Sequence, residues 1–111
     1  MSKYGARRTE YNGRTYDSGR EATRAAELRL MQRAGLIKDL REQVDYELLP
    51  SQKDEAGKTI ERPVRYRADF VYTDVPTNQT IVEDVKGCRT KEYIIKRKIM
   101  LFLYGIRIKE V

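Results

Sequence analysis

Two alternating segments joined by a short turn constrain the fold of this 111-residue chain more than any other feature. Apolar residues occupy every second position of residues 64–72, which is the period of a β-strand with one buried face. Residues 80–87 (TIVEDVKG) form a second candidate strand, and residues 74–79, which contain a proline and an asparagine, are typical of a turn. Because the connection is short, we expect the two strands to be antiparallel neighbours. One face of the first strand would carry Val64, Tyr66, Ala68, Phe70 and Tyr72.

The segments before this strand pair predict a hairpin, a helix and a strand. Asn12-Gly13 is a strong signal for a small hairpin. Residues 18–34 predict a helix, with Ser18 as the N-cap and Gly35 placed to end it. Residues 40–49 alternate well enough to predict a strand, and the polar stretch 50–61 reads as an exposed loop.

A second helix and a last strand follow the pair. Residues 90–104 predict a helix whose second half is apolar almost all round, so we expect that half to be buried. Gly105 stops the helix, and residues 106–111 alternate as a strand. A helix between two strands implies a crossover. We therefore expect one α/β domain, residues 1–111, with a mixed sheet of about four strands flanked by helices.

Composition excludes several classes of site. The chain has no histidine and a single cysteine, Cys88, which rules out Ser-His-Asp catalysis, histidine-ligated zinc and multi-cysteine metal clusters. Oxygen ligands would favour hard cations such as Mg²⁺ or Mn²⁺. No stretch approaches the roughly 18 apolar residues of a membrane span, and the first residues lack the apolar run of a signal peptide. We expect a cytoplasmic protein that does not enter a membrane.

The net charge favours a polyanionic partner. Lysine and arginine total 23 against 17 acids, giving a charge of +6 and a sequence pI near 9.5. Basic proteins gain affinity for nucleic acids by releasing counterions from phosphates, although many basic proteins bind none. The acids are informative if some of them lie where a phosphate must approach.

Two acids and a lysine are candidates for such a site. Asp84 and Lys86 lie on one side of the second strand, and Asp69 lies on the face of the first strand opposite Phe70. If Asp69 faces the same side, the three side chains converge. Two carboxylates can hold a divalent cation that activates a water and acts as Lewis acid, and a lysine can stabilise developing charge. On spacing alone, a surface Asp–Lys cross-strand pair is the more common explanation.

Four short blocks carry a resemblance to a known superfamily. They are residues 16–22 (YDSGREA), 66–70 (YRADF), 82–87 (VEDVKG) and 90–93 (TKEY). In this order they resemble the PD-(D/E)XK nucleases, and in particular a small phage-encoded family long catalogued as a domain of unknown function. The resemblance runs from about Tyr11 to the C-terminus. It implies a restriction-endonuclease-like core.

The resemblance also implies site residues. By position, Glu21 is the helix acid, Asp69 the main metal ligand, Asp84 the second ligand and Lys86 the catalytic lysine. Two departures from the pattern occur. Ala68 replaces the proline of the motif, and Asp84 stands where many relatives have glutamate. The neighbouring Glu83 could compete for that role, but it would face away from Lys86, which favours Asp84.

Glu21 has two interpretations. Ser18-x-x-Glu21 fits a capping box, in which the glutamate bonds the N-cap amide and has no catalytic role. Glu21 also shares a helix face with Ala25 and Leu28, so its carboxylate would point toward the protein body. A shared metal ion would explain an acid on that face.

Several further side chains are candidate phosphate contacts. Lys91, Lys96, Arg97 and Lys98 could line a phosphate groove or form an ordinary solvated helix face. Arg67 lies on the same strand face as Asp69 and could reach a phosphate. The tyrosines could stack on bases, but most are more simply explained as core residues.

Taken with the resemblance, these residues lead us to expect a Mg²⁺- or Mn²⁺-dependent DNA endonuclease that leaves 5′-phosphate and 3′-hydroxyl ends. A two-fold homodimer that cuts branched DNA, such as a Holliday junction in phage recombination, replication or packaging, suits so small a catalytic face. The alternatives are a non-catalytic nucleic-acid-binding adaptor on a nuclease-like fold and a basic protein–protein adaptor. The adaptor that contacts only protein would show no salt-dependent affinity for DNA.

Overall fold

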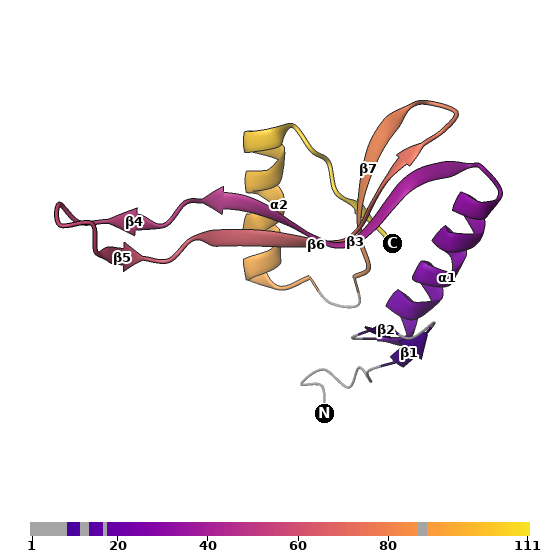
Figure 1. Cartoon of the computed structure of the whole chain (residues 1–111), viewed down its shortest axis with the longest axis horizontal. Helices are drawn as coiled ribbons and strands as arrows, with labels where there is room; N and C mark the ends of the chain where they lie inside the picture. The colour runs from indigo at the N-terminus through magenta and orange to yellow at the C-terminus, as the bar shows by residue number, and fades with distance from the viewer. Residues whose placement is uncertain (1–8, 12–13, 17, 87–88) are drawn as a thin grey trace.

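The computed structural model describes residues 9–11, 14–16, 18–86 and 89–111, and its centre is a four-stranded mixed sheet (Figure 1). The sheet has the order β3 (Ile37–Leu49), β6 (Val64–Asp74), β7 (Gln79–Asp84) and β8 (Lys109–Glu110). The β3–β6 and β6–β7 pairs are antiparallel, whereas β8 runs parallel to β7. The predicted strand pair and the mixed sheet of an α/β fold are confirmed.

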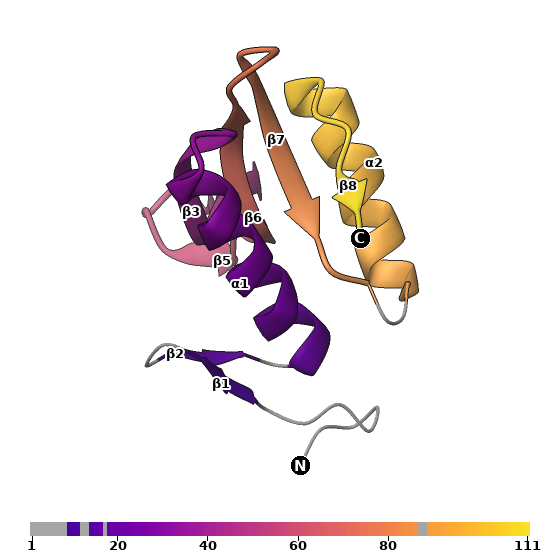
Figure 2. The ribbon, with the colours of Figure 1, turned by 90° about the vertical axis from the view of Figure 1, so that its right-hand side faces the viewer.

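One helix covers each face of the sheet (Figure 2). Helix α1 (Gly19–Arg33) packs on one face and helix α2 (Lys91–Tyr104) on the other. The α1-side core contains Tyr16, Ala22, Ala25, Leu28, Ile37, Phe70 and Tyr72. The α2-side core contains Leu48, Tyr66, Ala68, Val71, Val82, Tyr93 and Met100.

The caps explain why the helix bounds agree with the sequence prediction to within a residue. The Ser18 hydroxyl accepts the Glu21 N–H at 3.2 Å, and the Thr90 hydroxyl accepts the Tyr93 N–H at 3.1 Å. Gly105 ends α2 in the left-handed conformation, with φ of 66°. Both helices are therefore fixed at their starts by side chains that the sequence makes visible.

The side-chain alternation of the central strand changes face at Asp69, so the prediction of a single apolar face was wrong. Tyr66 and Ala68 pack on the α2 side, whereas Phe70 and Tyr72 pack on the α1 side. Gln43 lies opposite Asp69, between the Glu42–Phe70 pair and the Val44–Ala68 pair, and its φ is 55°. A left-handed residue rotates a strand about its axis, which the alternation in the sequence cannot reveal.

Several strand bounds and one loop also differ from the predictions. Strand β3 begins at Ile37 rather than at residue 40, β6 continues to Asp74, and β7 ends at Asp84, before Lys86. The predicted last strand, residues 106–111, is reduced to Lys109–Glu110. The predicted loop 50–61 is exposed, but it contains the short strands β4 (Gln52–Lys53) and β5 (Thr59–Glu61). They prolong β3 and β6 into an arm that projects from the body (Figure 1).

The prediction that the second half of α2 is buried was also wrong. Only Tyr93 and Met100 of this helix are buried, and residues 101–104 are exposed. The sheet next to the helix ends in β8, which has two residues, so it is too small to cover the helix all round.

The N-terminal hairpin is confirmed by β1 (Thr9–Tyr11) and β2 (Arg14–Tyr16), which pair antiparallel. The turn at residues 12–13, the basic residues Lys3, Arg7 and Arg8, and Cys88 lie outside the described residues. Within the described ranges, neither helix has the length and apolar character needed to cross a membrane.

Candidate functional site

Asp69 and Asp84 meet where strands β6 and β7 separate. The last pair of the hairpin joins Phe70 to Glu83, which places Asp69 and Asp84 one position beyond it. The Asp84 carboxyl group is close enough to act on the pKa of Asp69 by hydrogen bond and by charge, and Asp69 Oδ2 accepts the Val85 N–H at 2.8 Å. Asp84 is 3% exposed, and Asp69 is partly buried. The structure therefore brings together the two predicted metal ligands of the hairpin.

Lys86 completes this cluster. Its Nζ lies 3.1 Å from Asp84 Oδ1 and 3.9 Å from the centroid of the Tyr93 ring. A cation over an aromatic face is attracted to the ring, so the ammonium is held between a carboxylate and a π system. The predicted contact between Asp84 and Lys86 exists although Lys86 lies beyond the end of β7.

Tyr66 holds the second oxygen of Asp84. Its hydroxyl donates to Asp84 Oδ2 at 2.5 Å. Burial, and then the hydrogen bond and charge of Asp84, raise the pKa of Tyr66, so the phenol remains a proton donor at ordinary pH. Asp84 is thus oriented through both oxygens, by Tyr66 on one side and Lys86 on the other.

Tyr93 is fixed in turn by the last strand. Its hydroxyl donates to Glu110 Oε2 at 2.6 Å, and Arg89 and Arg97 pair with the same carboxylate. The Tyr93 hydrogen bond, together with those of the two arginines, lowers the pKa of Glu110 to about 2 despite some desolvation. The ring over Lys86 is therefore anchored by a carboxylate that stays ionised at neutral pH.

Glu21 points into the body, as its helix face predicted. It is 5% exposed, and its Oε1 accepts a hydrogen bond from Gln43 Nε2 at 2.7 Å. Ser18 caps the helix by accepting the Glu21 N–H, so half of the predicted capping box is present, while the carboxylate reaches Gln43 on β3. Gln43 owes this reach to its left-handed backbone opposite Asp69.

The arrangement holds two acids together and keeps the third slightly apart. Glu21 is near enough for its charge to act on Asp69. Across the described ranges, however, no three acidic or other ligand side chains form a group that could hold a metal ion. The Asp69–Asp84 pair fits a hard cation by its oxygen donors, whereas the Oε1 atom of Glu21 accepts a hydrogen bond from Gln43.

The surroundings of Asp69 favour its protonated form. Burial, the hydrogen bond and charge of Asp84 and the charge of Glu21 together raise the pKa of Asp69 to about 9, against the Val85 N–H. Protonation removes one of the two negative charges that the partly buried Asp69 and the buried Asp84 would carry. A strongly perturbed acid beside a second acid and a lysine is a pattern that occurs at functional sites.

Glu83 lies on the other face of the sheet and is excluded from this cluster. It is fully buried and receives two hydrogen bonds from Arg24, at 2.9 and 2.7 Å, and one from the Tyr72 hydroxyl. The same contact with Glu83 raises the pKa of Arg24. This placement agrees with the choice of Asp84 over Glu83 and gives Glu83 a structural role.

The predicted phosphate contacts do not converge on the acids. Arg67 pairs with Asp45 at 2.9 Å on the surface, and Lys96 pairs with Glu92 at 3.0 Å. Lys91 and Lys98 are exposed on α2. Their contact with a phosphate backbone stays a prediction.

Sequence reasoning missed four side chains that support the cluster: Arg20, Gln43, Tyr66 and Tyr93. Arg20 donates to the carbonyl oxygen of Lys86 at 3.2 Å and borders a hollow of about 500 Å³ beside α1. Arg20, Tyr66 and Tyr93 lie within the short blocks quoted above, so their positions could have been noted. Gln43 has no such signal, because its role depends on a backbone conformation.

The family model described as "Protein of unknown function (DUF1064)" matches residues 1–109. Among curated proteins and among solved structures, no significant match was found.

Proposed function

The chain belongs to the DUF1064 family of proteins of unknown function, and from the cluster on its β6–β7 hairpin we propose that it is a Mg²⁺-dependent DNA endonuclease of the PD-(D/E)XK superfamily. The observation that carries this proposal is the contact of Asp69, Asp84 and Lys86. Two carboxyl groups beside an ammonium, with Asp84 buried and Asp69 and Lys86 partly buried, are unfavourable for stability alone, because the charged groups lose hydration. It is useful where a divalent cation and a phosphate must be bound together.

Asp69 and Asp84 would hold the metal ion, with the Glu21 carboxylate as a third ligand. When bound, Mg²⁺ supplies positive charge and Lewis acidity at the scissile phosphate. Tyr66 keeps Asp84 oriented through its second oxygen. Lys86 stabilises the negative charge that develops on the phosphate, and Tyr93 holds its ammonium in place.

DNA is the proposed substrate because of the charge of the chain. The excess of six positive charges favours a polyanion. Branched DNA, such as a junction formed in phage recombination or packaging, is the substrate we favour, because a small catalytic face covers little of a linear duplex.

A non-catalytic DNA-binding adaptor is the second candidate. It is favoured by one observation, that no three ligand side chains in the described part of the chain form a group that could hold a metal ion. An adaptor would bind DNA in a salt-dependent manner, and this affinity would not change when Asp69 and Lys86 are replaced.

The proposal predicts metal-dependent cleavage. The purified protein should cut a four-way DNA junction, and more slowly a linear duplex, in Mg²⁺ or Mn²⁺ but not in excess EDTA. Products separated on a sequencing gel should carry 5′-phosphate and 3′-hydroxyl ends. The double variant Asp69→Ala/Lys86→Ala, prepared in parallel, should be inactive. Cleavage that persists in this variant, or wild-type protein that binds DNA and cuts no substrate in either metal, would refute the endonuclease.

A further inference from the structure

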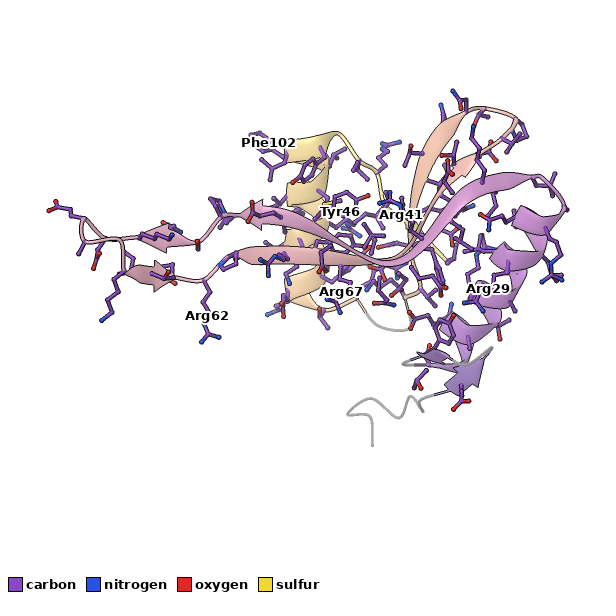
Figure 3. All side chains as sticks on the ribbon, in the orientation of Figure 1. Arg29, Arg41, Tyr46, Arg62, Arg67 and Phe102 are labelled. Carbon is purple, nitrogen blue, oxygen red and sulfur yellow. The ribbon has the colours of Figure 1, made fainter. Side chains whose placement is uncertain are left out.

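The C-terminal end of helix α2 exposes an unusual amount of apolar surface. Phe102 is 86% exposed, and Leu101, Leu103 and Tyr104 are 50%, 48% and 47% exposed. Phe102 points outward from the helix on the side from which the arm projects (Figure 3). A contiguous apolar patch on a soluble protein marks an interaction site more often than scattered surface residues do.

The arm, residues 50–63, prolongs β3 and β6, and its base is joined to this helix end by the Tyr104 hydroxyl, which donates to the Glu47 carbonyl oxygen at 2.5 Å. Every residue from 49 to 62 is exposed, including Leu49 at its base and Ile60 on β5. Because of the arm, the molecule measures 53 × 38 × 25 Å, and its radius of gyration is 16.3 Å. A compact domain of this length has a radius near ~13 Å.

The arm is nevertheless well formed. At its tip, Asp54 Oδ1 accepts the N–H groups of Ala56 and Lys58, each at 2.9 Å, and the Asp54 carbonyl oxygen accepts the Gly57 N–H. Gly57 adopts the left-handed conformation that this turn requires, with φ of 83°. An ordered projecting element loses little conformational entropy when a partner covers it.

Charge argues against DNA as the partner of this surface. The arm carries three cations, Lys53, Lys58 and Arg62, and three acids, Asp54, Glu55 and Glu61, so it is neutral in a chain whose net charge is +6. In the last half of α2, residues 98–104, Lys98 is the single charged residue. A DNA-binding arm would be expected to concentrate cations. A neutral arm of mixed charge is suited to a protein with the same mixture.

We propose that the C-terminal end of α2 and the arm form the interface of a homodimer, in which the arm of each protomer lies against the partner copy. Across a two-fold axis the same patch meets itself, so the cations of one arm can face the acids of the other. Large side chains bury on the order of 150 Å² each, so the helix end and the arm offer roughly the 800 Å² per partner of a standard interface.

A row of tyrosines links this interface to the acid cluster. The ring centroids of Tyr104 and Tyr46 are 5.7 Å apart, those of Tyr46 and Tyr66 6.5 Å, and those of Tyr66 and Tyr93 6.4 Å. The row ends at Lys86. The interface goes beyond the proposed function, and under that function it would bring two cutting sites into one particle.

The mass of the free protein in solution tests the inference. In EDTA and without DNA, sedimentation velocity between about 1 and 100 µM should show wild type at twice the 13.1 kDa of the chain. Phe102→Glu and Ile60→Glu should each weaken the dimer by at least ~30-fold, the scale of a central interface residue. Leu30→Glu is the matched control, because Leu30 is 60% exposed on α1 across the sheet, and it should leave the dimer unchanged.

Wild-type protein that stays at the mass of one chain at 100 µM would overturn the dimer, as would a dimer that survives both Phe102→Glu and Ile60→Glu together. A monomeric wild type whose DNA affinity falls in Phe102→Glu would assign the surface to DNA and also overturn it. These measurements need no cleavage, so a monomer that cuts DNA refutes the dimer alone, and an inactive dimer refutes the endonuclease alone.

Discussion

Asp84→Asn will lower the rate of DNA cleavage by roughly 10³-fold, the loss typical of removing one preorganised electrostatic group from an active site. The substitution keeps the shape of the side chain and leaves an oxygen to accept the Tyr66 hydroxyl. It removes the negative charge that would hold the cation and that now attracts Lys86 at 3.1 Å. The measurement is single-turnover cleavage of a four-way junction in saturating Mg²⁺.

Circular dichroism and thermal unfolding of Asp84→Asn should match wild type, so that loss of cleavage is not loss of fold. A rate within tenfold of wild type would show that Asp84 is not a ligand. The positions of Asp69 and Lys86 beside Asp84 would then require another explanation.

Glu83→Gln, one residue away, will lower the stability of the fold and leave the rate of DNA cleavage nearly unchanged. The free energy of unfolding should fall by about 3 kcal/mol, because the partly buried guanidinium of Arg24 keeps only the exposed Glu27 as a counter-charge. Arg24 donates two hydrogen bonds to Glu83, and Tyr72 donates a third. Urea unfolding monitored by tyrosine fluorescence measures the loss, and the cleavage rate per folded molecule should stay within a few-fold of wild type.

The double variant Arg24→Met/Glu83→Gln is the control for this interpretation. With the guanidinium absent, it should be no less stable than Glu83→Gln alone. A Glu83→Gln protein of wild-type stability would contradict the structural role, and one that is stable but inactive would move the catalytic acid from Asp84 to Glu83. The two neighbouring acids can thus be separated by which property each substitution changes.

Local signals in the sequence were sufficient for most of the fold. Ser18 and Thr90 cap the helices where their side chains predicted it, and the short turn between β6 and β7 fixed the central hairpin. These features depend on a few adjacent residues. The prediction for the end of α2 failed because apolar composition cannot say whether a sheet is large enough to cover a helix.

The acidic residues of the candidate site could also be predicted from the sequence. Strand position allowed Asp69 and Asp84 to share one side, the resemblance assigned both to one site, and the helix face placed Glu21 toward the protein body. The side chains that position these acids could not be predicted. Their contacts depend on the change of face at Asp69 and on the left-handed backbone of Gln43 opposite it. That change brings Tyr66 to the α2 side, where it reaches Asp84, and no alternation pattern contains this information.

Calorimetric titration with Mn²⁺ in the absence of DNA shows whether Asp69 and Asp84 hold a divalent cation, on which the proposed nuclease depends. The raised pKa of Asp69, about 9, means that the cation displaces a proton at neutral pH. Titrations in two buffers of different ionisation enthalpy should therefore show release of up to one proton. The apparent affinity should rise by up to about tenfold per pH unit between pH 6 and 8, since the competing proton is lost as the pH approaches that pKa.

Asp69→Asn is the matched control, because its amide can replace the protonated carboxyl, accepting from Val85 and donating to Asp84, without binding a cation in its place. The account predicts saturable Mn²⁺ binding with proton release in wild type and none in Asp69→Asn. Wild-type protein that binds no Mn²⁺ at pH 8, or Asp69→Asn protein that binds it as tightly as wild type, would contradict the account.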